Sequence, residues 1–194
     1  SGGFPRRSRG IADEGTLQDR FRGLMRGSLT HIASRPSGCH LRKRPSWWAM
    51  ANDCVHLRPV EERDLAMLER IDKEPALSEP FEWRGFANAA ERRHRWERDG
   101  YLGDGEGLLV VALLDQTFLG FVVWAPAGGS AHLRGCFRVG ILLLPDHRGR
   151  GYGSIAQALL AEYLFANTLV NRVEATTEAD NIAEQRPLEK AGFT

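Results

Sequence analysis

Cysteine is scarce in this chain, and its spacing argues against two kinds of stabilising site. Three cysteines occur among 194 residues, they lie far apart, and no Cys-x-x-Cys pair is present. Neither a disulfide framework nor a cysteine-ligated zinc site is therefore indicated, and no metal is expected. Thiols without a pairing pattern are typical of a reducing compartment, so we expect a cytoplasmic protein.

Long apolar runs are missing too. No run of about 18 consecutive apolar residues occurs, so the sequence offers no candidate for a membrane-spanning helix. The N-terminal region carries basic residues but not the apolar core of a signal peptide. The composition is nevertheless 42% apolar, with nine Phe and five Trp, which is enough to build a core. A chain of this length is expected to fold as one domain, or as one domain with an extension.

Charge is unevenly distributed along the sequence. Residues 1–50 hold ten Lys/Arg against three Asp/Glu, whereas the remainder holds 16 against 22. We therefore predict a loosely ordered basic extension over 1–50, in which only 16–25 has helical spacing, and a folded domain over 51–194. Alternatively, the extension docks on nucleic acid or a partner, or Trp47 and Trp48 anchor it to the domain. No nucleic-acid-binding motif supports docking on nucleic acid, so nucleic acid is not an expected partner.

The hydrophobic pattern from Val55 onward changes between the periods of strands and helices. Strands are expected at 55–57, 107–114, 117–124, 137–144 and 172–177, and helices at 61–72, 88–102, 152–166 and 181–191. Hairpins thus come first and a βαβ crossover follows. This order predicts the α/β (α+β) class, with a mixed, mostly antiparallel sheet and helices packed on it.

A basic, glycine-rich turn, "RGRGYGS" at 148–154, joins a predicted strand to a predicted helix. Alternate glycines lack Cβ atoms, so backbone N–H groups can approach a ligand closely. The helix N-terminus and the two arginines add positive charge, and together these features indicate a phosphate-binding turn. The nucleotide P-loop requires a lysine that is missing here, and the dinucleotide fingerprint fits poorly. The alternative is a flexible surface turn with solvated arginines.

The context of this turn resembles a known family. A strand, then Arg148-x-x-Gly151-x-Gly153, a helix, a strand, and Asn181 followed by "LEKAGF" (188–193) resemble the GCN5-related N-acetyltransferase (GNAT) superfamily. The resemblance covers roughly Val55 to Thr194 and is closest to the branch that acetylates the N-termini of ribosomal proteins and many small amines. It implies the GNAT fold, acetyl-CoA as cosubstrate, and transfer of an acetyl group to a primary amine.

The resemblance also implies which residues bind the cosubstrate. Strand 137–144 is expected to separate from strand 172–177, so that exposed backbone binds the acetyl and pantetheine groups as an added strand would. The N–H of Ile141 is then the candidate donor to the oxyanion of the tetrahedral intermediate. The residues expected to contact acetyl-CoA are Ile141, Leu143, Arg148, Gly149, Arg150, Gly151, Tyr152, Gly153, Ser154 and Asn181.

The groups that transfer protons are harder to assign. Some family members carry a catalytic base on the strand 137–144, which has no carboxylate here, so Glu174 on the neighbouring strand is the candidate base. The alternative for Glu174 is a solvated residue or an ion-pair partner. His132 and His147 are weaker candidates, for a catalytic role and for lining the phosphate turn respectively.

The general acid is also unassigned by the resemblance. Many members have Tyr where this chain has Leu188, and another branch has Ser where this chain has Glu184. Protonation of the departing thiolate by water is one alternative.

The missing acid and base also support a second function for the whole chain, that of a CoA-binding sensor or assembly module without catalytic activity. A third, weaker alternative is a nucleic-acid-associated protein that uses the basic extension.

Two further expectations concern the acceptor side and the sheet edge. Acidic residues such as Glu79, Glu82 and Glu91 are candidates for attracting a cationic amine. The family continues for two more strands after the Gly-Phe pair, whereas this sequence stops at Thr194. Either those strands lie outside the sequence, or a neighbouring copy completes the sheet, as in a homodimer. Without either one, the strand at 172–177 is expected to have an exposed edge.

Overall fold

The computed structural model describes most of the chain from residue 28 onward. The described residues are 28–35, 54–80, 85–86, 88–103, 105–127 and 135–194. The predictions for the helix at 16–25 and for Trp47, Trp48, Glu82 and His132 lie outside these residues.

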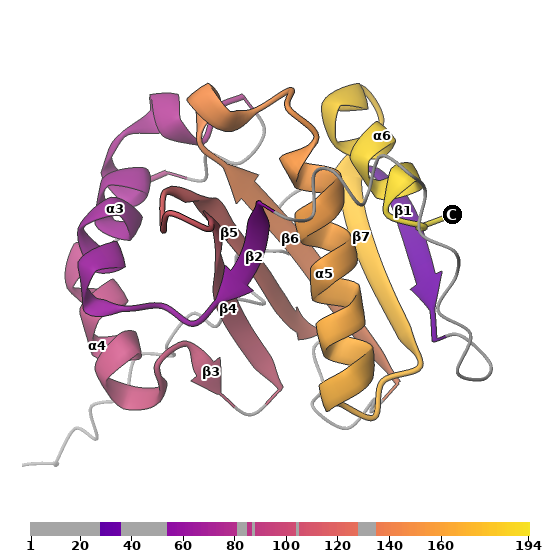
Figure 1. Cartoon of the computed structure of the whole chain (residues 1–194), viewed down its shortest axis with the longest axis horizontal. Coiled ribbons are helices and arrows are strands. Elements are labelled where there is room, and N and C mark those ends of the chain that lie inside the picture. Colours follow the sequence, from indigo (N-terminus) through magenta and orange to yellow (C-terminus); the bar gives the residue numbers. More distant parts are fainter. Residues whose placement is uncertain (1–27, 36–53, 81–84, 87, 104, 128–134) are drawn as a thin grey trace, which may run out of the picture.

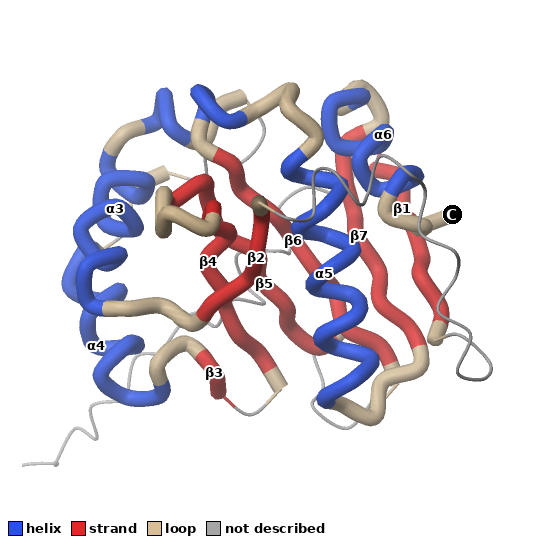
Figure 2. The backbone as a smooth tube through the Cα atoms, viewed as in Figure 1, coloured by secondary structure: helices blue, strands red, loops and turns tan. Residues whose placement is uncertain are grey.

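A mixed seven-stranded sheet forms the centre of the molecule (Figures 1 and 2). Its spatial order is β1-β7-β6-β5-β4-β2, and the short β3 pairs with β4. β6 and β7 run parallel and the other pairings are antiparallel, which confirms the predicted mixed, mostly antiparallel sheet. The strands are β1 (Ser28–Ser34), β2 (Val55–Arg58), β3 (Leu102–Gly103), β4 (Glu106–Leu113), β5 (Phe118–Pro126), β6 (Cys136–Leu143) and β7 (Arg172–Glu178).

Helices cover both faces of this sheet. They are α3 (Glu62–Lys73), α4 (Ala89–Asp99), α5 (Tyr152–Asn167) and α6 (Ile182–Lys190), with short 3-10 turns η1 (Pro75–Leu77) and η2 (Pro145–His147). Figure 1 shows α3 and α4 together at one side of the sheet and α5 lying across β6 and β7. The predicted elements from Val55 onward are confirmed with small shifts of their ends, apart from helix 88–102, because α4 ends at Asp99 and Leu102 already belongs to β3. The turns η1 and η2 were not predicted, because short elements have little periodicity.

The alternation of side chains along the central strands divides the core into two clusters. Leu108 and Val110 of β4 belong to the cluster beneath α3, whereas Leu109 and Val111 belong to the cluster beneath α5 and α6. Each face of β4 and β5 is therefore apolar, and both strands are almost completely buried. Full burial of one such side chain contributes about 1.5–3 kcal/mol, so these strands hold the two helical layers together.

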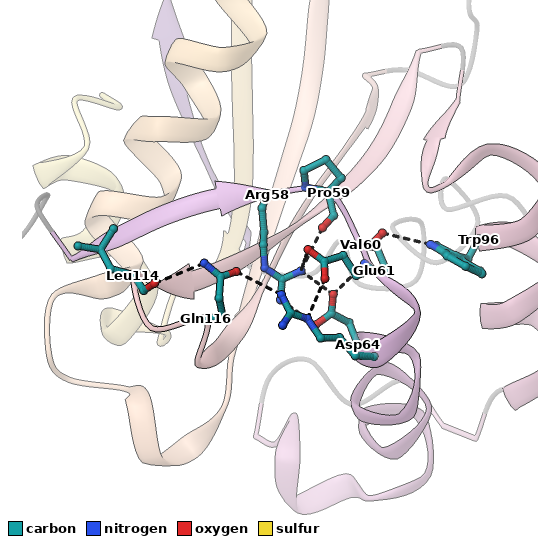
Figure 3. Close-up of polar contacts among 9 residues, drawn as sticks. Arg58, Pro59, Val60, Glu61, Asp64, Trp96, Leu114 and Gln116 are labelled. Atoms are coloured by element: carbon teal, nitrogen blue, oxygen red, sulfur yellow. Dashed lines mark hydrogen bonds and ion pairs between the residues drawn. The ribbon is translucent and has the colours of Figure 1, made fainter.

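The start of α3 is fixed by a buried ion pair (Figure 3). Arg58 Nη1 and Nη2 donate to Asp64 Oδ2 and Oδ1 at 2.6 and 2.8 Å, and both side chains are buried. Asp64 Oδ2 also accepts from the backbone N–H of Glu61 at 2.8 Å. The indole N–H of Trp96 in α4 donates to the carbonyl of Val60 at 3.1 Å. These contacts join the end of β2 to both helices of the layer.

Strand β1 corrects the prediction made for the N-terminal segment. Residues 28–34 were expected to be loosely ordered, but they pair antiparallel with β7 over its whole length, from Ser28 opposite Glu178 to Ser34 opposite Arg172. Arg35 adds bonds from its guanidinium to the carbonyls of Thr168 and Val170. The edge of β7, which was expected to be exposed, is therefore covered. Short local patterns do not reveal such pairing, because the partner strand lies more than a hundred residues away.

Candidate functional site

The two parallel strands separate partway along their length. β6 and β7 are paired from Cys136 opposite Arg172 to Val139 opposite Ala175, and no further. β6 continues to Leu143 and β7 to Glu178, so their last residues are no longer partners of each other. We call this separation the β6–β7 fork, and it confirms the predicted divergence. Figure 1 shows the fork opening toward the N-terminal end of α5.

The last residues of β6 direct main-chain groups toward the fork, of which the carbonyl of Leu143 accepts from Arg148 Nε at 2.8 Å. The N–H of Leu144 donates to the carbonyl of Leu119 in β5 at 2.9 Å. Because N–H and C=O groups alternate in direction along a strand, the groups of Ile141 and Leu143 point away from β5. Their side chains pack against the cluster beneath α5. Two alternate main-chain positions are therefore directed toward the space where an extended ligand would pair like a strand.

The glycine-rich turn adopts a conformation that requires glycine. Gly149 and Gly151 have φ of 74° and 84°, and a Cβ added at either position would have no atom within 4 Å. Gly151 is also the N-cap of α5, which has no side-chain cap. The first N–H groups of α5 are thus left for a ligand, next to open space and at the positive end of the helix dipole. Such an arrangement can hold an anion such as a pyrophosphate.

Three other residues of the turn lie closer to the protein. A Cβ added at Gly153 would lie 3.7 Å from Leu143 Cδ1 and 3.8 Å from Pro187 Cβ, so α5 begins in close contact with β6 and α6. Tyr152 packs against the same core cluster, and Ser154 is buried. The turn is therefore held firmly at its helical end.

The two arginines of the turn differ in their surroundings. Arg150 is exposed and makes no hydrogen bond or ion pair with the residues that the structure describes. The guanidinium of Arg148 instead donates to the carbonyls of Leu143, Leu77 and Glu79. Both arginines were predicted to bind pyrophosphate, and for Arg148 the observed bonds favour a different role.

Asn181 and Glu184 begin α6. Asn181 is buried, and its Oδ1 accepts from the N–H of Glu184 at 3.2 Å, so its observed role is that of a helix cap. Its contact with acetyl-CoA remains a prediction. The carboxylate of Glu184 accepts a hydrogen bond from Gln157 of α5, which is 3% exposed. The Oε1 atom of Gln157 has no partner within the described residues. Gln157 was not among the predicted site residues, because it lies within an apolar helix that carries no motif.

Glu174 lies in the paired part of β6 and β7. Its Oε1 accepts from Arg138 Nη2 at 2.9 Å and Nε at 3.2 Å, and the residue is 8% exposed. Its other oxygen accepts from the thiol of Cys136 at 3.7 Å. The carboxylate is thus engaged by a neighbouring arginine within the paired part of the two strands. The role of Glu174 as general base stays a prediction, and its contacts favour the ion-pair alternative.

Cys136 completes this group of charged side chains. Burial raises the pKa of its thiol, and the hydrogen bond from Arg172 Nε at 3.3 Å only partly offsets that effect. The thiol is therefore neutral at neutral pH and is a poor nucleophile.

The remaining candidates have structural explanations or lie at the surface. Leu188 is fully buried in the cluster beneath α5 and α6, so it acts as a core residue. His147 ends η2, immediately before the glycine-rich turn. Glu79 and Glu91 are exposed on the side of α3 and α4.

The part of the chain that the structure describes offers neither a metal site nor a membrane span. No group of three or more His, Cys, Asp and Glu side chains there is arranged to hold a metal ion. None of the helices there is both long and apolar enough to cross a membrane.

Comparison with known proteins agrees with this geometry. A family model described as an acetyltransferase (GNAT) domain matches residues 55–194. The spermidine N-acetyltransferase of Vibrio cholerae, solved with CoA and spermine, is 17% identical with a TM-score of 0.58, covering 72% of this chain and 80% of that one. The aminoglycoside acetyltransferase AAC(6′)-Ib, solved with coenzyme A and kanamycin, is 22% identical with a TM-score of 0.58, covering 72% and 84%.

A third similar structure is a GNAT-family acetyltransferase from Bacillus anthracis, 19% identical with a TM-score of 0.56, covering 72% of this chain and 79% of that one. At such identities the likeness establishes the fold alone. No curated protein matches the sequence significantly.

Proposed function

Because this chain belongs to the GNAT acetyltransferase family, we propose that it transfers the acetyl group of acetyl-CoA to a primary amine by direct attack on the thioester. The observation that carries the proposal is the β6–β7 fork, with the backbone of Ile141 and Leu143 directed into it. The fork opens toward an uncapped helix N-terminus preceded by a glycine-rich turn. One ligand with an extended amide arm and a pyrophosphate fits both features.

In this proposal the donor binds mainly through the main chain. The pantetheine arm pairs with β6 at Ile141 and Leu143, as an additional strand would. The pyrophosphate lies against the N–H groups of residues 149–154 and near the guanidinium of Arg150. Main-chain recognition tolerates any apolar side chain at the pairing positions, which is consistent with the sequence of β6.

The chemical step forms a C–N bond and breaks the C–S bond of the thioester. The N–H of Ile141 donates to the carbonyl oxygen and stabilises the negative charge that develops on it. The nitrogen loses a proton after attack, and the departing thiolate gains one. We assign both transfers to water, because Glu174 is held by Arg138 and Leu188 is apolar and buried.

The proposed acceptor is a small cationic amine or a protein N-terminus. The domain that carries the site holds more acidic than basic residues, and Glu79 and Glu91 are exposed on the side of α3 and α4. Acidic residues there would attract a cationic amine. Spermine and kanamycin, which similar enzymes bind, are suitable first probes.

Release of CoA thiol from acetyl-CoA tests the proposal directly. We expect thiol release to increase when spermine, kanamycin or a peptide with a free N-terminus is added. Absence of release with every amine, together with measurable CoA binding by calorimetry, would favour the alternative of a CoA-binding module without catalytic activity. The apolar Leu188 and the engaged Glu174 are the observations that support that alternative.

The substitution Gly151→Glu tests the donor site. A glutamate there places negative charge and bulk in the turn at a positive φ, so we expect CoA affinity to fall at least about tenfold. The matched control is Gly100→Glu, because Gly100 also has a positive φ and open space but lies at the end of α4. Equal CoA affinities of the two variants in calorimetry would show that the turn does not bind the pyrophosphate.

A further inference from the structure

The guanidinium group of Arg148 joins parts of the chain that are 69 and 71 residues apart. Its Nη1 donates to the carbonyl of Glu79 at 2.7 Å and its Nη2 to the carbonyl of Leu77 at 3.0 Å. Its Nε donates to the carbonyl of Leu143, the last residue of β6, at 2.8 Å. All three acceptors belong to the backbone. One planar side chain therefore connects the turn after α3 to the end of β6.

Within the described residues, one apolar contact also attaches the segment 75–80 to the rest of the fold. Leu77 packs against the cluster beneath α3, as does Leu144 just beyond β6. Ser78 is buried, but its hydroxyl bonds within the segment, to the carbonyl of Pro75 at 3.3 Å. The apolar contact fixes one side of the segment, and the bonds from Arg148 fix the other.

The position of Arg148 relates these contacts to the reaction. Arg148 begins the glycine-rich turn that is proposed to hold pyrophosphate, and Leu143 lies in the β6–β7 fork. The segment 75–80 directly follows α3, on the side from which the amine is proposed to approach. The three bonds thus link the donor side of the site to the acceptor side.

We propose that Arg148 is a positioning residue that holds the segment 75–80 on the end of β6, so that the acceptor side keeps its place relative to bound acetyl-CoA. Arginine suits this role because its rigid fork of five N–H donors reaches three carbonyls at once, whereas a lysine ammonium is a single point on a flexible stem. The meaning of this role for acetyl transfer rests on the proposed function. The positioning itself does not.

Hydrogen exchange provides a readout that is independent of any substrate. The amides of Leu77, Ser78 and Glu79 are bonded within the segment, to the carbonyls of Glu74 and Pro75. In Arg148→Gln we expect them to exchange about tenfold faster, since the segment loses the two hydrogen bonds from Arg148 that oppose its local opening. Arg148→Lys keeps the charge and should also accelerate exchange. Arg150→Gln, in the same turn, should leave exchange of these amides unchanged.

Calorimetry with CoA separates positioning from phosphate binding. We expect Arg150→Gln to weaken CoA binding more than Arg148→Lys does, because Arg150 is the arginine whose guanidinium is free of the protein's own carbonyls. Where spermine or kanamycin is acetylated, Arg148→Lys should raise the KM for the amine at least about threefold and change the KM for acetyl-CoA less. If neither amine is acetylated, the proposed function is in question, but the exchange result still stands.

The proposal is overturned if Arg148→Gln leaves the exchange of these three amides unchanged while CoA affinity falls as it does in Arg150→Gln. Arg148 would then be a pyrophosphate ligand and nothing more. Unfolding of both Arg148 variants in circular dichroism would also overturn it, because a residue that positions one surface segment is not needed for the fold.

Discussion

At the scale of single residues, the carboxylate of Asp64 joins the end of β2 to the start of α3 through its bonds with Arg58 and Glu61. Burial alone would raise the pKa of Asp64, but the hydrogen bonds from Arg58 and from the N–H of Glu61 outweigh it, so the pKa lies below its ordinary value of 3.8. The carboxylate is therefore charged in the folded protein at neutral pH. Removing that charge leaves Arg58 buried without its partner.

We predict that Asp64→Asn destabilises the protein by about 3 kcal/mol, because breaking one side of a buried ion pair leaves the other charge uncompensated. Urea unfolding followed by circular dichroism measures the change. Glu74→Gln is the matched control, since Glu74 pairs with Arg70 at the exposed end of α3 and its loss should have no measurable effect. Equal effects of the two substitutions would contradict the structural importance of the buried pair.

The same pair predicts a pH dependence. Because the pKa of Asp64 is lower in the folded protein than in the unfolded chain, its contribution to stability is complete above the unfolded pKa. That contribution declines below the unfolded pKa and is lost as the pH falls through the folded pKa. The stability difference between the original protein and Asp64→Asn should therefore shrink as urea unfolding is repeated from pH 6 toward pH 3. A difference that stays constant over this range would argue against the assignment.

At the scale of elements, β1 explains how β7 can leave β6. Beyond Ala175, β7 has no pairing with β6, and β1 continues beside it as far as Glu178. The bonds between Ile32 and Thr194 lie on the opposite side of β1, so the N–H groups of Leu29 and His31 point toward β7. The N-terminal strand thus holds one edge of β7 in place over the stretch where the other edge has left β6.

Two proline substitutions test the role of β1. Leu29→Pro removes an N–H that points toward the part of β7 that is no longer paired with β6. Thr30→Pro removes an N–H that points away from β7, and both residues are exposed. We expect Leu29→Pro to lower the free energy of unfolding by about 1 kcal/mol more than Thr30→Pro, and to weaken CoA binding more. Urea unfolding and calorimetry measure the two effects. Indistinguishable variants would show that β1 does not support the fork.

At the scale of the whole molecule, the proposed site lies where separate layers meet. The fork belongs to the sheet, the glycine-rich turn begins α5, and the segment 75–80 extends from α3 on the opposite face. A ligand that contacts these parts binds the folded state and not the unfolded chain. It should therefore stabilise the whole molecule by mass action.

Thermal unfolding provides the corresponding test. CoA at about one hundred times its Kd should add about 2.7 kcal/mol to the stability, which corresponds to a rise in Tm of roughly 5–10 °C for a protein of this size. Pantetheine lacks the pyrophosphate and should raise the Tm less at the same concentration. A rise with CoA that persists in Gly151→Glu would place the binding site elsewhere.

Much of the fold was predictable because its signals are local. The central strands alternate or are wholly apolar, and two glycines of the turn, Gly149 and Gly151, stand where the backbone has positive φ. The family resemblance added the expected fork between β6 and β7. The candidate positions at Ile141 and Leu143 therefore required no tertiary information beyond that resemblance.

The sequence by itself determined the order of elements from Val55 onward, the mixed sheet and the place of the glycine-rich turn, because these depend on spacing within segments and on the order in which the segments follow one another. Only the tertiary structure decided that residues 28–34 cover the edge of β7, that Arg138 forms an ion pair with Glu174, and that Arg148 holds the segment 75–80. These contacts join residues from 36 to more than a hundred positions apart. Their energy comes from hydrogen bonds and charges that meet only after the chain has folded, so no local pattern encodes them.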